Sequence, residues 1–306
     1  FPTCPYPNPE IRQALQKGLE LCAEVHPDLL LATDPDADRT GIAVPHKGEY
    51  VLLSGNEVGV LLSDWLAGRA AARGENVADK LVVTTIVSSS MLDALARKHG
   101  FELRRTLTGF KYIGEQIARL EEKGEQGRFL FGFEESYGYL SGTYVRDKDA
   151  VVASMLICEM ARDYKSRGMD LVDAVEALYD ELGYYRNRTI SLAYPGAEGA
   201  EQMRAIMADL RAEHPAQLAG LAVEGVVDYA QGATMPRIGG DAADEQTLPG
   251  ANVFEINLEG ANKVIIRPSG TEPKIKAYVF ARGTTDAEAL ALVDELDAAA
   301  RKLLGA

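Results

Sequence analysis

The chain has 306 residues, 46% of them hydrophobic and 25% charged, which is enough for two domains with ordinary hydrophobic cores. Its net charge of −14 repels phosphate backbones and excludes nucleic acid as an expected partner, and no stretch approaches the roughly 18 apolar residues of a membrane span. The three cysteines, Cys4, Cys22 and Cys158, fit neither a zinc pattern nor a disulfide framework, so we expect reduced thiols in a cytoplasmic protein.

The first expected elements flank an acidic turn. Asn8-Pro9-Glu10 predicts the start of a helix that runs to about residue 23, with Asn8 as its N-cap. Residues 29–32 predict a short buried strand and residues 41–44 a second one, with Asp34-Pro35-Asp36-Ala37-Asp38-Arg39 between them. Because the chain begins at Phe1 in a proline-rich stretch, we interpret it as a fragment or a processed product.

Strands and helices then alternate. We expect strands at 81–87, 101–106 and 128–133, and helices at 56–72, from Ser88-Ser89-Ser90 to Gly100, and at 110–122, 150–165 and 171–182. This alternation predicts mixed or parallel three-layer α/β architecture, with a sheet covered by helices on both faces.

The pattern changes near residues 182–186. Strands are expected at 185–193, 223–229, 253–257, 263–266 and 275–280, with helices at 198–213 and 285–304. Clustered strands with flanking helices predict a smaller α+β domain at the C-terminal end. The stretch 232–250 is rich in Gly, Pro and Asp, and it predicts a long surface loop.

The acidic turn is the strongest chemical signal. Asp34, Asp36 and Asp38 stand at alternate positions after a strand, where open α/β sheets bind their ligands. Three close carboxylates repel one another unless a cation neutralises them, and their hard oxygens suit magnesium. An EF-hand is excluded because the sixth loop position is Arg39 instead of Gly and the twelfth is Pro45 instead of Glu. The alternative is an acidic turn with local hydrogen bonds.

A second signal lies between two expected strands, in Arg267-Pro268-Ser269-Gly270-Thr271-Glu272-Pro273-Lys274. Two cations, two hydroxyls and a glycine are the parts of a phosphate-binding loop, although the GxxxxGK[ST] order of a P-loop is absent. An ordinary hairpin loop is the alternative.

Three weaker segments complete the set. Gly132-Phe133-Glu134-Glu135-Ser136-Tyr137-Gly138 follows a strand and offers acceptors for sugar hydroxyls. Thr108-Gly109-Phe110-Lys111 opens a helix, which favours either an anion or plain capping. Arg146-Asp147-Lys148-Asp149 precedes another helix and reads by itself as a charged loop.

In this order, the five segments resemble the α-D-phosphohexomutase family over essentially the whole chain. The resemblance implies four domains, with a catalytic serine in a Ser-His-Asn-Pro motif of the first, and this chain contains no such motif. It therefore implies that residues 1–47 are the end of domain 2, residues 48–182 domain 3 and residues 183–306 domain 4. The nucleophilic serine would lie outside the chain, which would be inactive alone.

The resemblance also implies roles. Asp34, Asp36 and Asp38 would hold Mg²⁺ against a seryl phosphate, with Arg39 beside the transferring group and Lys148 as a candidate for proton transfer. The residues implied to bind substrate are Thr108, Gly109, Glu134 and Ser136 for the sugar, and Arg267, Ser269, Gly270, Thr271 and Lys274 for the phosphate that does not react. The implied reaction interconverts hexose 1-phosphate and hexose 6-phosphate through a hexose 1,6-bisphosphate.

Several alternatives stay open at this point. The sugar could be that of a phosphomannomutase or a phosphopentomutase, although the Glu-Glu-Ser-Tyr-Gly form resembles phosphoglucomutases more than the phosphomannomutase form, in which a Met and a Gly-His pair surround the Ser. A non-catalytic sugar-phosphate-binding protein would use the same loops. A two-metal phosphatase would need a second carboxylate and histidine cluster, and the scattered histidines 26, 46, 99 and 214 predict none. The pattern leaves the oligomeric state open.

Overall fold

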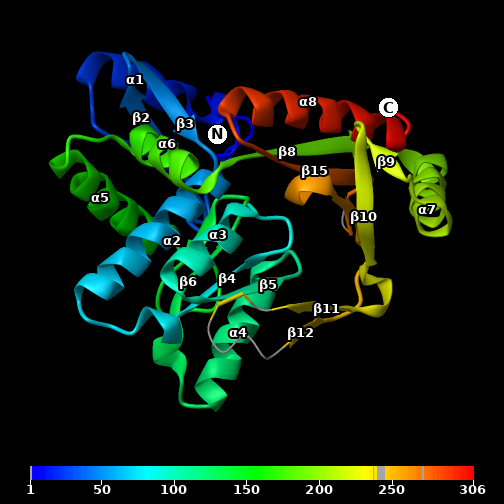
Figure 1. The fold of residues 1–306 in the computed structure, drawn as a ribbon. Helices are drawn as coiled ribbons and strands as arrows, with labels where there is room; N and C mark the ends of the chain where they lie inside the picture. The colour runs from blue at the N-terminus through cyan, green and yellow to red at the C-terminus, as the bar shows by residue number, and fades with distance from the viewer. Residues whose placement is uncertain (1, 237, 240–244, 271) are drawn as a thin grey trace. The chain divides into compact units, whose positions relative to one another are not determined.

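The computed structural model describes residues 2–236, 238–239, 245–270 and 272–306 (Figure 1). The chain divides into two compact units, one of residues 1–181 with 236–244 and the other of residues 182–235 with 245–306. The predicted class, α/β followed by a smaller α+β part, is confirmed by the sheets described below. Among the described residues, no helix is long and apolar enough to cross a membrane.

The first part of unit 1 is a three-stranded antiparallel sheet with one helix. Its elements are the 3₁₀ turn η1 (Arg12–Leu15), α1 (Gln16–Val25), β1 (Leu30–Thr33), β2 (Thr40–His46) and β3 (Glu49–Leu53), and the strand order is β1-β2-β3. Strand β3 had not been predicted.

The predicted start of the first helix at Asn8 is wrong. The side chain of Asn8 accepts a hydrogen bond from the backbone N of Glu10 at 3.0 Å within a turn, and helical geometry begins only at Arg12. Pro9 packs so closely against Gly41 that a Cβ at residue 41 would lie 2.7 Å from the Cβ of Pro9. A contact with a distant strand therefore overrides the local helix signal.

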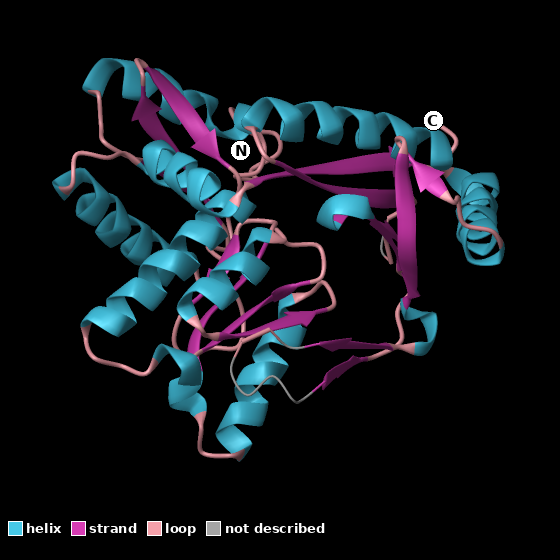
Figure 2. Ribbon diagram, in the orientation of Figure 1, coloured by secondary structure: helices cyan, strands magenta, loops and turns pink. Residues whose placement is uncertain are grey.

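The larger part of unit 1 is a sheet between helices (Figure 2). Its strands are β4 (Leu81–Thr85), β5 (Glu102–Thr106), β6 (Phe129–Glu134) and β7 (Gly138–Leu140), in the order β5-β4-β6-β7. The first three are parallel, as predicted, and β7, which had not been predicted, is antiparallel to β6. The helices are α2 (Gly55–Ala72), α3 (Met91–His99), α4 (Phe110–Glu122), α5 (Ala150–Ser166) and α6 (Leu171–Leu182), with 3₁₀ turns η2 (Val77–Asp79) and η3 (Gln126–Arg128).

The two faces of this sheet have different packing. Ile113, Ile117 and Leu120 of α4 form a core cluster with Leu81 and Val83 of β4. On α2, Gly59 lies directly against the ring of Phe133, which is fully buried. The sheet therefore carries a helix layer on each face. This packing holds the parallel strands, and so the loops that follow them, in position.

Local signals set the helix ends in unit 1. Ser54 and Glu57 form a reciprocal capping box at the start of α2, because the hydroxyl of Ser54 accepts from the backbone N of Glu57 and the carboxylate accepts from the backbone N of Ser54. Gly100 ends α3 with φ of 83°, a left-handed conformation that favours glycine.

Unit 2 is one antiparallel sheet with two long helices. Its strands are β8 (Tyr184–Ala193), β9 (Gln217–Leu218), β10 (Leu221–Asp228), β13 (Phe254–Leu258), β14 (Asn262–Pro268) and β15 (Lys274–Gly283), in the order β8-β15-β14-β13-β10-β9. Helices α7 (Gly196–Ala212) and α8 (Asp286–Leu303) share one core with the sheet, and η4 (Tyr229–Gln231) and η5 (Glu259–Ala261) are 3₁₀ turns.

The prediction of a long surface loop over residues 232–250 is wrong where two strands interrupt it, and residues 237 and 240–244 of that stretch lie outside the described residues. Residues Ala233–Pro236 form β11 and residues Glu245–Leu248 form β12, and the two strands pair as a small separate sheet. Four-residue strands show too little alternation to be recognised beside so many glycines and prolines.

Candidate functional site

The turn after β1 is organised by the carboxylate of Asp34. Its Oδ1 accepts hydrogen bonds from the backbone N of Asp38 at 3.0 Å and of Arg39 at 2.9 Å. Ala37 adopts a φ of 54°, and its backbone N donates to the carbonyl of Asp34 at 3.1 Å. The turn thereby brings one oxygen each of Asp34, Asp36 and Asp38 within 4.8 Å of one another.

One oxygen of the Asp38 carboxylate accepts no hydrogen bond from the described residues. Its Oδ2 pairs with the Nζ of Lys148 at 2.9 Å, whereas its Oδ1 is buried and has no hydrogen-bond donor in the described part of the chain. The Nε of Arg39 lies 3.9 Å from that oxygen, beyond hydrogen-bond distance. A buried anionic oxygen without a donor costs about 1–3 kcal/mol or more. Mg²⁺ would remove that cost, because it takes hard carboxylate oxygens as ligands, so these residues fit the ion.

Glu134 joins two of the segments singled out in the sequence. It stands at the end of β6, and its Oε1 accepts a hydrogen bond of 2.7 Å from the backbone N of Gly109, the first residue before α4. Gly109 has φ of 119°, which favours glycine at this close approach. Burial raises the pKa of Glu134, and the hydrogen bond from Gly109 with the charges of Lys148 and Arg39 offsets only part of that effect.

Lys148 lies between two carboxylates. Its Nζ is 2.9 Å from the Oδ2 of Asp38 and 2.9 Å from the Oδ1 of Asp147. Burial lowers the pKa of Lys148, but these two hydrogen bonds outweigh burial and hold the pKa above its usual value. Its stem crosses Gly138 so closely that a Cβ there would lie 2.2 Å from the Cδ of Lys148. The lysine is thus a fixed cation beside the acidic turn.

Backbone hydrogen bonds tie these loops together. The backbone N of Thr40 donates to the carbonyl of Tyr137 at 3.0 Å, which connects the acidic turn to the loop after β6. The backbone N of Ala150, at the start of α5, donates to the carbonyl of Ala37 at 3.1 Å. Three segments that are distant in sequence therefore form one framework, and Lys148 and Asp38 meet inside it.

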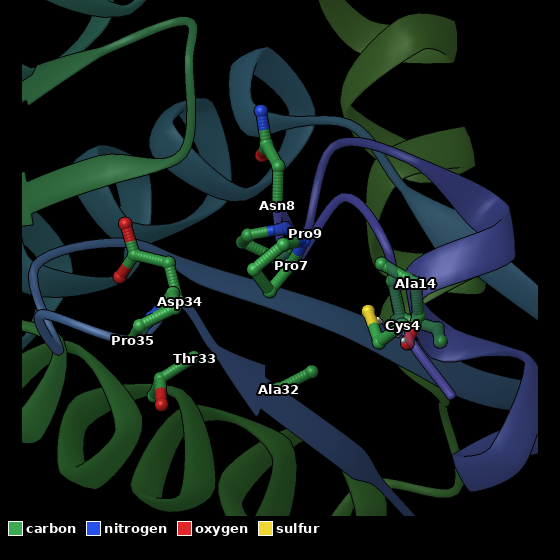
Figure 3. A pocket seen from close by; sticks show the side chains of 10 residues that line it. Cys4, Pro7, Asn8, Pro9, Ala14, Ala32, Thr33, Asp34 and Pro35 are labelled. Atoms are coloured by element: carbon green, nitrogen blue, oxygen red, sulfur yellow. Dashed lines mark hydrogen bonds between the residues drawn. The ribbon is translucent and has the colours of Figure 1, made fainter. Parts of the chain in front are cut away.

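The N-terminal residues add contacts that sequence reasoning missed. Glu10 pairs with the Nη1 of Arg39 at 3.0 Å, so Arg39 is held between Glu10 and the acidic turn. A small pocket of about 290 Å³ lies beside the turn, between the first residues and β1 (Figure 3). Its labelled lining includes Cys4, Pro9 and Asp34. Nothing in the residues around Glu10 marks it as a partner of an arginine that follows much later in the chain.

The predicted phosphate loop belongs to unit 2 and closes the hairpin between β14 and β15. The backbone N of Ser269 donates to the carbonyl of Lys274 at 2.8 Å, and the Oγ of Ser269 accepts from the backbone N of Glu272 at 3.2 Å. Lys274 pairs with Glu272 at 2.7 Å. Gly270 faces open space, and Arg267 forms no ion pair with any residue that the structure describes. Thr271, also predicted to bind phosphate, lies outside the described residues.

Unit 1 thus brings Asp34, Asp36, Asp38, Arg39 and Lys148 together, and it links Gly109 to Glu134. Thr108 and Ser136 are half-buried in the same two loops.

The expectation that no histidine joins a carboxylate cluster is wrong. His46 has Asp173 and Glu176 as close neighbours. The cluster stands at the far end of β2 from the acidic turn, six residues or roughly 20 Å along the strand. The two ions of a two-metal site lie roughly 3.5–4 Å apart, so these two clusters are too far from each other to form a two-metal site.

Three family models match consecutive parts of the chain. They are phosphoglucomutase/phosphomannomutase alpha/beta/alpha domain II over residues 1–48, alpha/beta/alpha domain III over residues 54–182, and the C-terminal domain over residues 197–299.

Individual relatives agree with these matches. A phosphoglucomutase of Staphylococcus aureus is 37% identical over 273 residues, covering 89% of this chain and 48% of the relative, and one of Staphylococcus epidermidis is 36% identical over 274 residues. The chain spans about half the length of these curated relatives. Among solved structures, the Paramecium phosphoprotein pp63/parafusin has a TM-score of 0.66 at 18% identity, covering 97% of this chain and 50% of its own. A family protein of Burkholderia thailandensis has a TM-score of 0.60 at 15% identity, covering 97% and 51%. At these identities, the two structures show a shared fold.

Proposed function

The chain belongs to the phosphoglucomutase/phosphomannomutase family, and on that premise we propose that it forms the metal-binding and substrate-binding half of a phosphoglucomutase-type enzyme. The enzyme would interconvert hexose 1-phosphate and hexose 6-phosphate through a hexose 1,6-bisphosphate. The 306 residues contain no Ser-His-Asn-Pro motif, so the phosphorylated serine would come from outside them.

Asp34, Asp36 and Asp38 are the proposed ligands of Mg²⁺, which would neutralise charge on the transferring phosphoryl group. The turn supports this role because hydrogen bonds to Asp34 preorganise its backbone. Arg39, anchored by Glu10, would contact the same phosphoryl group, and its fixed guanidinium suits that geometry.

Lys148 is the proposed proton donor. A lysine carries its proton at neutral pH, so it would act as an acid toward a sugar oxygen in one half-reaction. The pair with Asp38 limits its motion, which would orient the proton beside the phosphoryl group.

Two sets of residues are proposed to bind substrate. Thr108, Gly109, Glu134 and Ser136 would contact the sugar, with Glu134 positioned by its bond to Gly109. Arg267, Ser269, Gly270, Thr271 and Lys274 would bind the phosphate that does not react. The hairpin that carries this second set offers an arginine and an open glycine, which are the groups an incoming phosphate needs.

The single observation that carries the proposal is Asp38, with one oxygen paired to Lys148 and the other buried without a donor. Calorimetry with Mg²⁺ on the 306-residue chain tests it. We expect Asp38→Asn to weaken binding at least tenfold, whereas Glu122→Gln, which removes the same charge from an exposed position, should leave binding unchanged. Equal affinity in all three proteins would contradict the metal assignment.

A second experiment tests the reaction. The 306-residue chain alone should not turn over glucose 1-phosphate, and a protein that also carries the serine motif should do so. In that longer protein, kcat/KM should be higher for glucose 1-phosphate than for mannose 1-phosphate, by a factor that corresponds to about 1–3 kcal/mol, and lowest for ribose 1-phosphate. A preference for the pentose would overturn the hexose assignment, and turnover by the chain alone would overturn the placement of the serine.

A further inference from the structure

His46 lies at the end of the β2–β3 hairpin, with most of its ring shielded from solvent. The connecting residues, Lys47 and Gly48, both have positive φ, at 49° and 92°, which is the two-residue hairpin geometry that fixes strand register. Only 10% of the His46 side chain is exposed. Its Nδ1 lies 2.9 Å from the Oδ2 of Asp170, at hydrogen-bond distance from that carboxylate.

The start of α6 supplies the other groups. Asp170 caps the helix through Oδ1, which accepts from the backbone N of Val172 and of Asp173, so its Oδ2 is left for His46. Asp173 and Glu176 follow at three-residue spacing and share a helix face. The Oε1 of Glu176 is 3.9 Å from the Nε2 of His46, and the Oδ1 of Asp173 is 3.8 Å from Nδ1.

The charges around this ring are not balanced. Three carboxylates face His46, and Lys47, which is largely exposed, lies 3.9 Å from one of them. In the neutral tautomer whose Nδ1 donates its proton to Asp170, Nε2 keeps its lone pair and lies 3.9 Å from the Oε1 of Glu176. A carboxylate that accepts from one imidazole nitrogen while the other nitrogen binds a metal is a recurrent arrangement in metalloproteins.

We propose that His46, Asp173 and Glu176 bind a divalent transition-metal ion of the zinc class, with Asp170 orienting the imidazole. One ligand atom from each lies within 4.8 Å of the others. Tetrahedral zinc at 2.0–2.1 Å needs ligand separations of about 3.3 Å, so rotations of the exposed carboxylates would complete the shell. An imidazole nitrogen beside carboxylates favours Zn²⁺, Co²⁺ or Ni²⁺ over Mg²⁺.

The site is accessible and separate from the acidic turn. The side chains of Asp173 and Glu176 are 39% and 54% exposed, so an ion can reach the cluster from solvent, and Asp173 also lines a pocket of about 480 Å³. The bound ion would fasten the β2–β3 hairpin to α6, and would do so independently of the proposed mutase function.

Zn²⁺ binding to the 306-residue chain, followed through the imidazole nitrogens, tests the proposal. The chain has four histidines, so a long-range ¹H–¹⁵N spectrum resolves each ring, and His46→Asn assigns its signal. Excess Mg²⁺ is present throughout, so that Zn²⁺ has to compete for the acidic turn. We expect the His46 Nε2 resonance to move at one equivalent of Zn²⁺ while those of His26, His99 and His214 stay in place.

The affinity is measured by competition with a chromophoric chelator. Glu176→Gln, at a side chain that is 54% exposed, should weaken Zn²⁺ binding at least tenfold, and Glu122→Gln should not change it. Glu176→Gln also keeps the test valid if His46→Asn fails to fold. An unmoved His46 resonance, or wild-type affinity in Glu176→Gln, would overturn the site.

Discussion

Replacing Gly59 by alanine should destabilise unit 1, although alanine is normally the better helix residue. Gly59 lies within α2, and a Cβ there would stand 2.3, 2.4 and 2.6 Å from three atoms of the Phe133 ring. Carbon atoms pack at about 3.5–4.0 Å, so the ring would have to move by about an ångström. It has no free space to do so, because Phe133 is fully buried and stacks on Phe131 and Tyr139.

The same helix offers a matched control in Gly68. It is exposed, and a Cβ there would meet no atom within 4 Å. Gly68→Ala should therefore stabilise the protein by about 0.5–1 kcal/mol through helix propensity alone. At Gly59 the same gain is opposed by overpacking, and we expect a net loss of about 1–3 kcal/mol. The two substitutions should therefore change the free energy of unfolding in opposite directions.

Urea unfolding followed by tryptophan fluorescence measures both effects. Trp65 is the single tryptophan of the chain and lies in α2 itself, so its signal reports on unit 1. The midpoint should fall for Gly59→Ala and rise for Gly68→Ala, at an unchanged m-value. Phe133→Leu should lose less stability in the Gly59→Ala background than in the wild type, because the shorter side chain makes room. A Gly59→Ala midpoint at or above the wild-type value would refute the packing argument.

Three other predictions follow from buried charges. Burial raises the pKa of Asp64, but interactions with His99 and a neighbouring lysine lower it by more, so the net shift is downward. The ionised carboxylate therefore stabilises the fold above pH of about 4, and this contribution is lost as the pH falls through the lowered pKa. Asp64→Asn should remove that part of the acid dependence of the urea midpoint, and identical pH profiles would contradict it. Lys148→Met should tighten Mg²⁺ binding several-fold in calorimetry, because it removes a cation from Asp38; weaker binding would count against the proposed metal-binding role of the acidic turn. Arg105→Lys should cost about 2–4 kcal/mol in urea unfolding, because the guanidinium donates to three backbone carbonyls and one carboxylate, and a loss below 1 kcal/mol would refute that estimate.

The end of α3 at Gly100 was predicted because its determinant is local. Ser54 with Glu57, and Gly100, act within a few residues of the ends that they set. The first helix was mispredicted because Pro9 packs on Gly41, a contact that depends on the folded β2. Strands β11 and β12 were missed because their short runs hold too few residues to show a period.

The candidate site divides in the same way. Asp34, Asp36 and Asp38 were recognisable because a single turn carries all three. The pairing of Lys148 with Asp38 was not, since it depends on backbone hydrogen bonds between distant segments. His46 gave no signal for a related reason: its carboxylates belong to a helix that follows more than a hundred residues later.

The backbone bonds around Tyr137 have a consequence for chimeric proteins. The backbone N of Thr40 holds the loop after β6, and the backbone N of Ala150, at the start of α5, holds the acidic turn. We therefore expect the three segments to keep their shapes only together. A chimera that takes the loop after β6 from a relative would have to take residues 34–40, 134–140 and 146–150 as a set. The hairpin at 268–274 closes on itself through Ser269 and Lys274, and it can be exchanged as a single cassette. If the proposed roles hold, substrate preference would be easier to change in the proposed phosphate-binding hairpin than in the proposed sugar-binding loop.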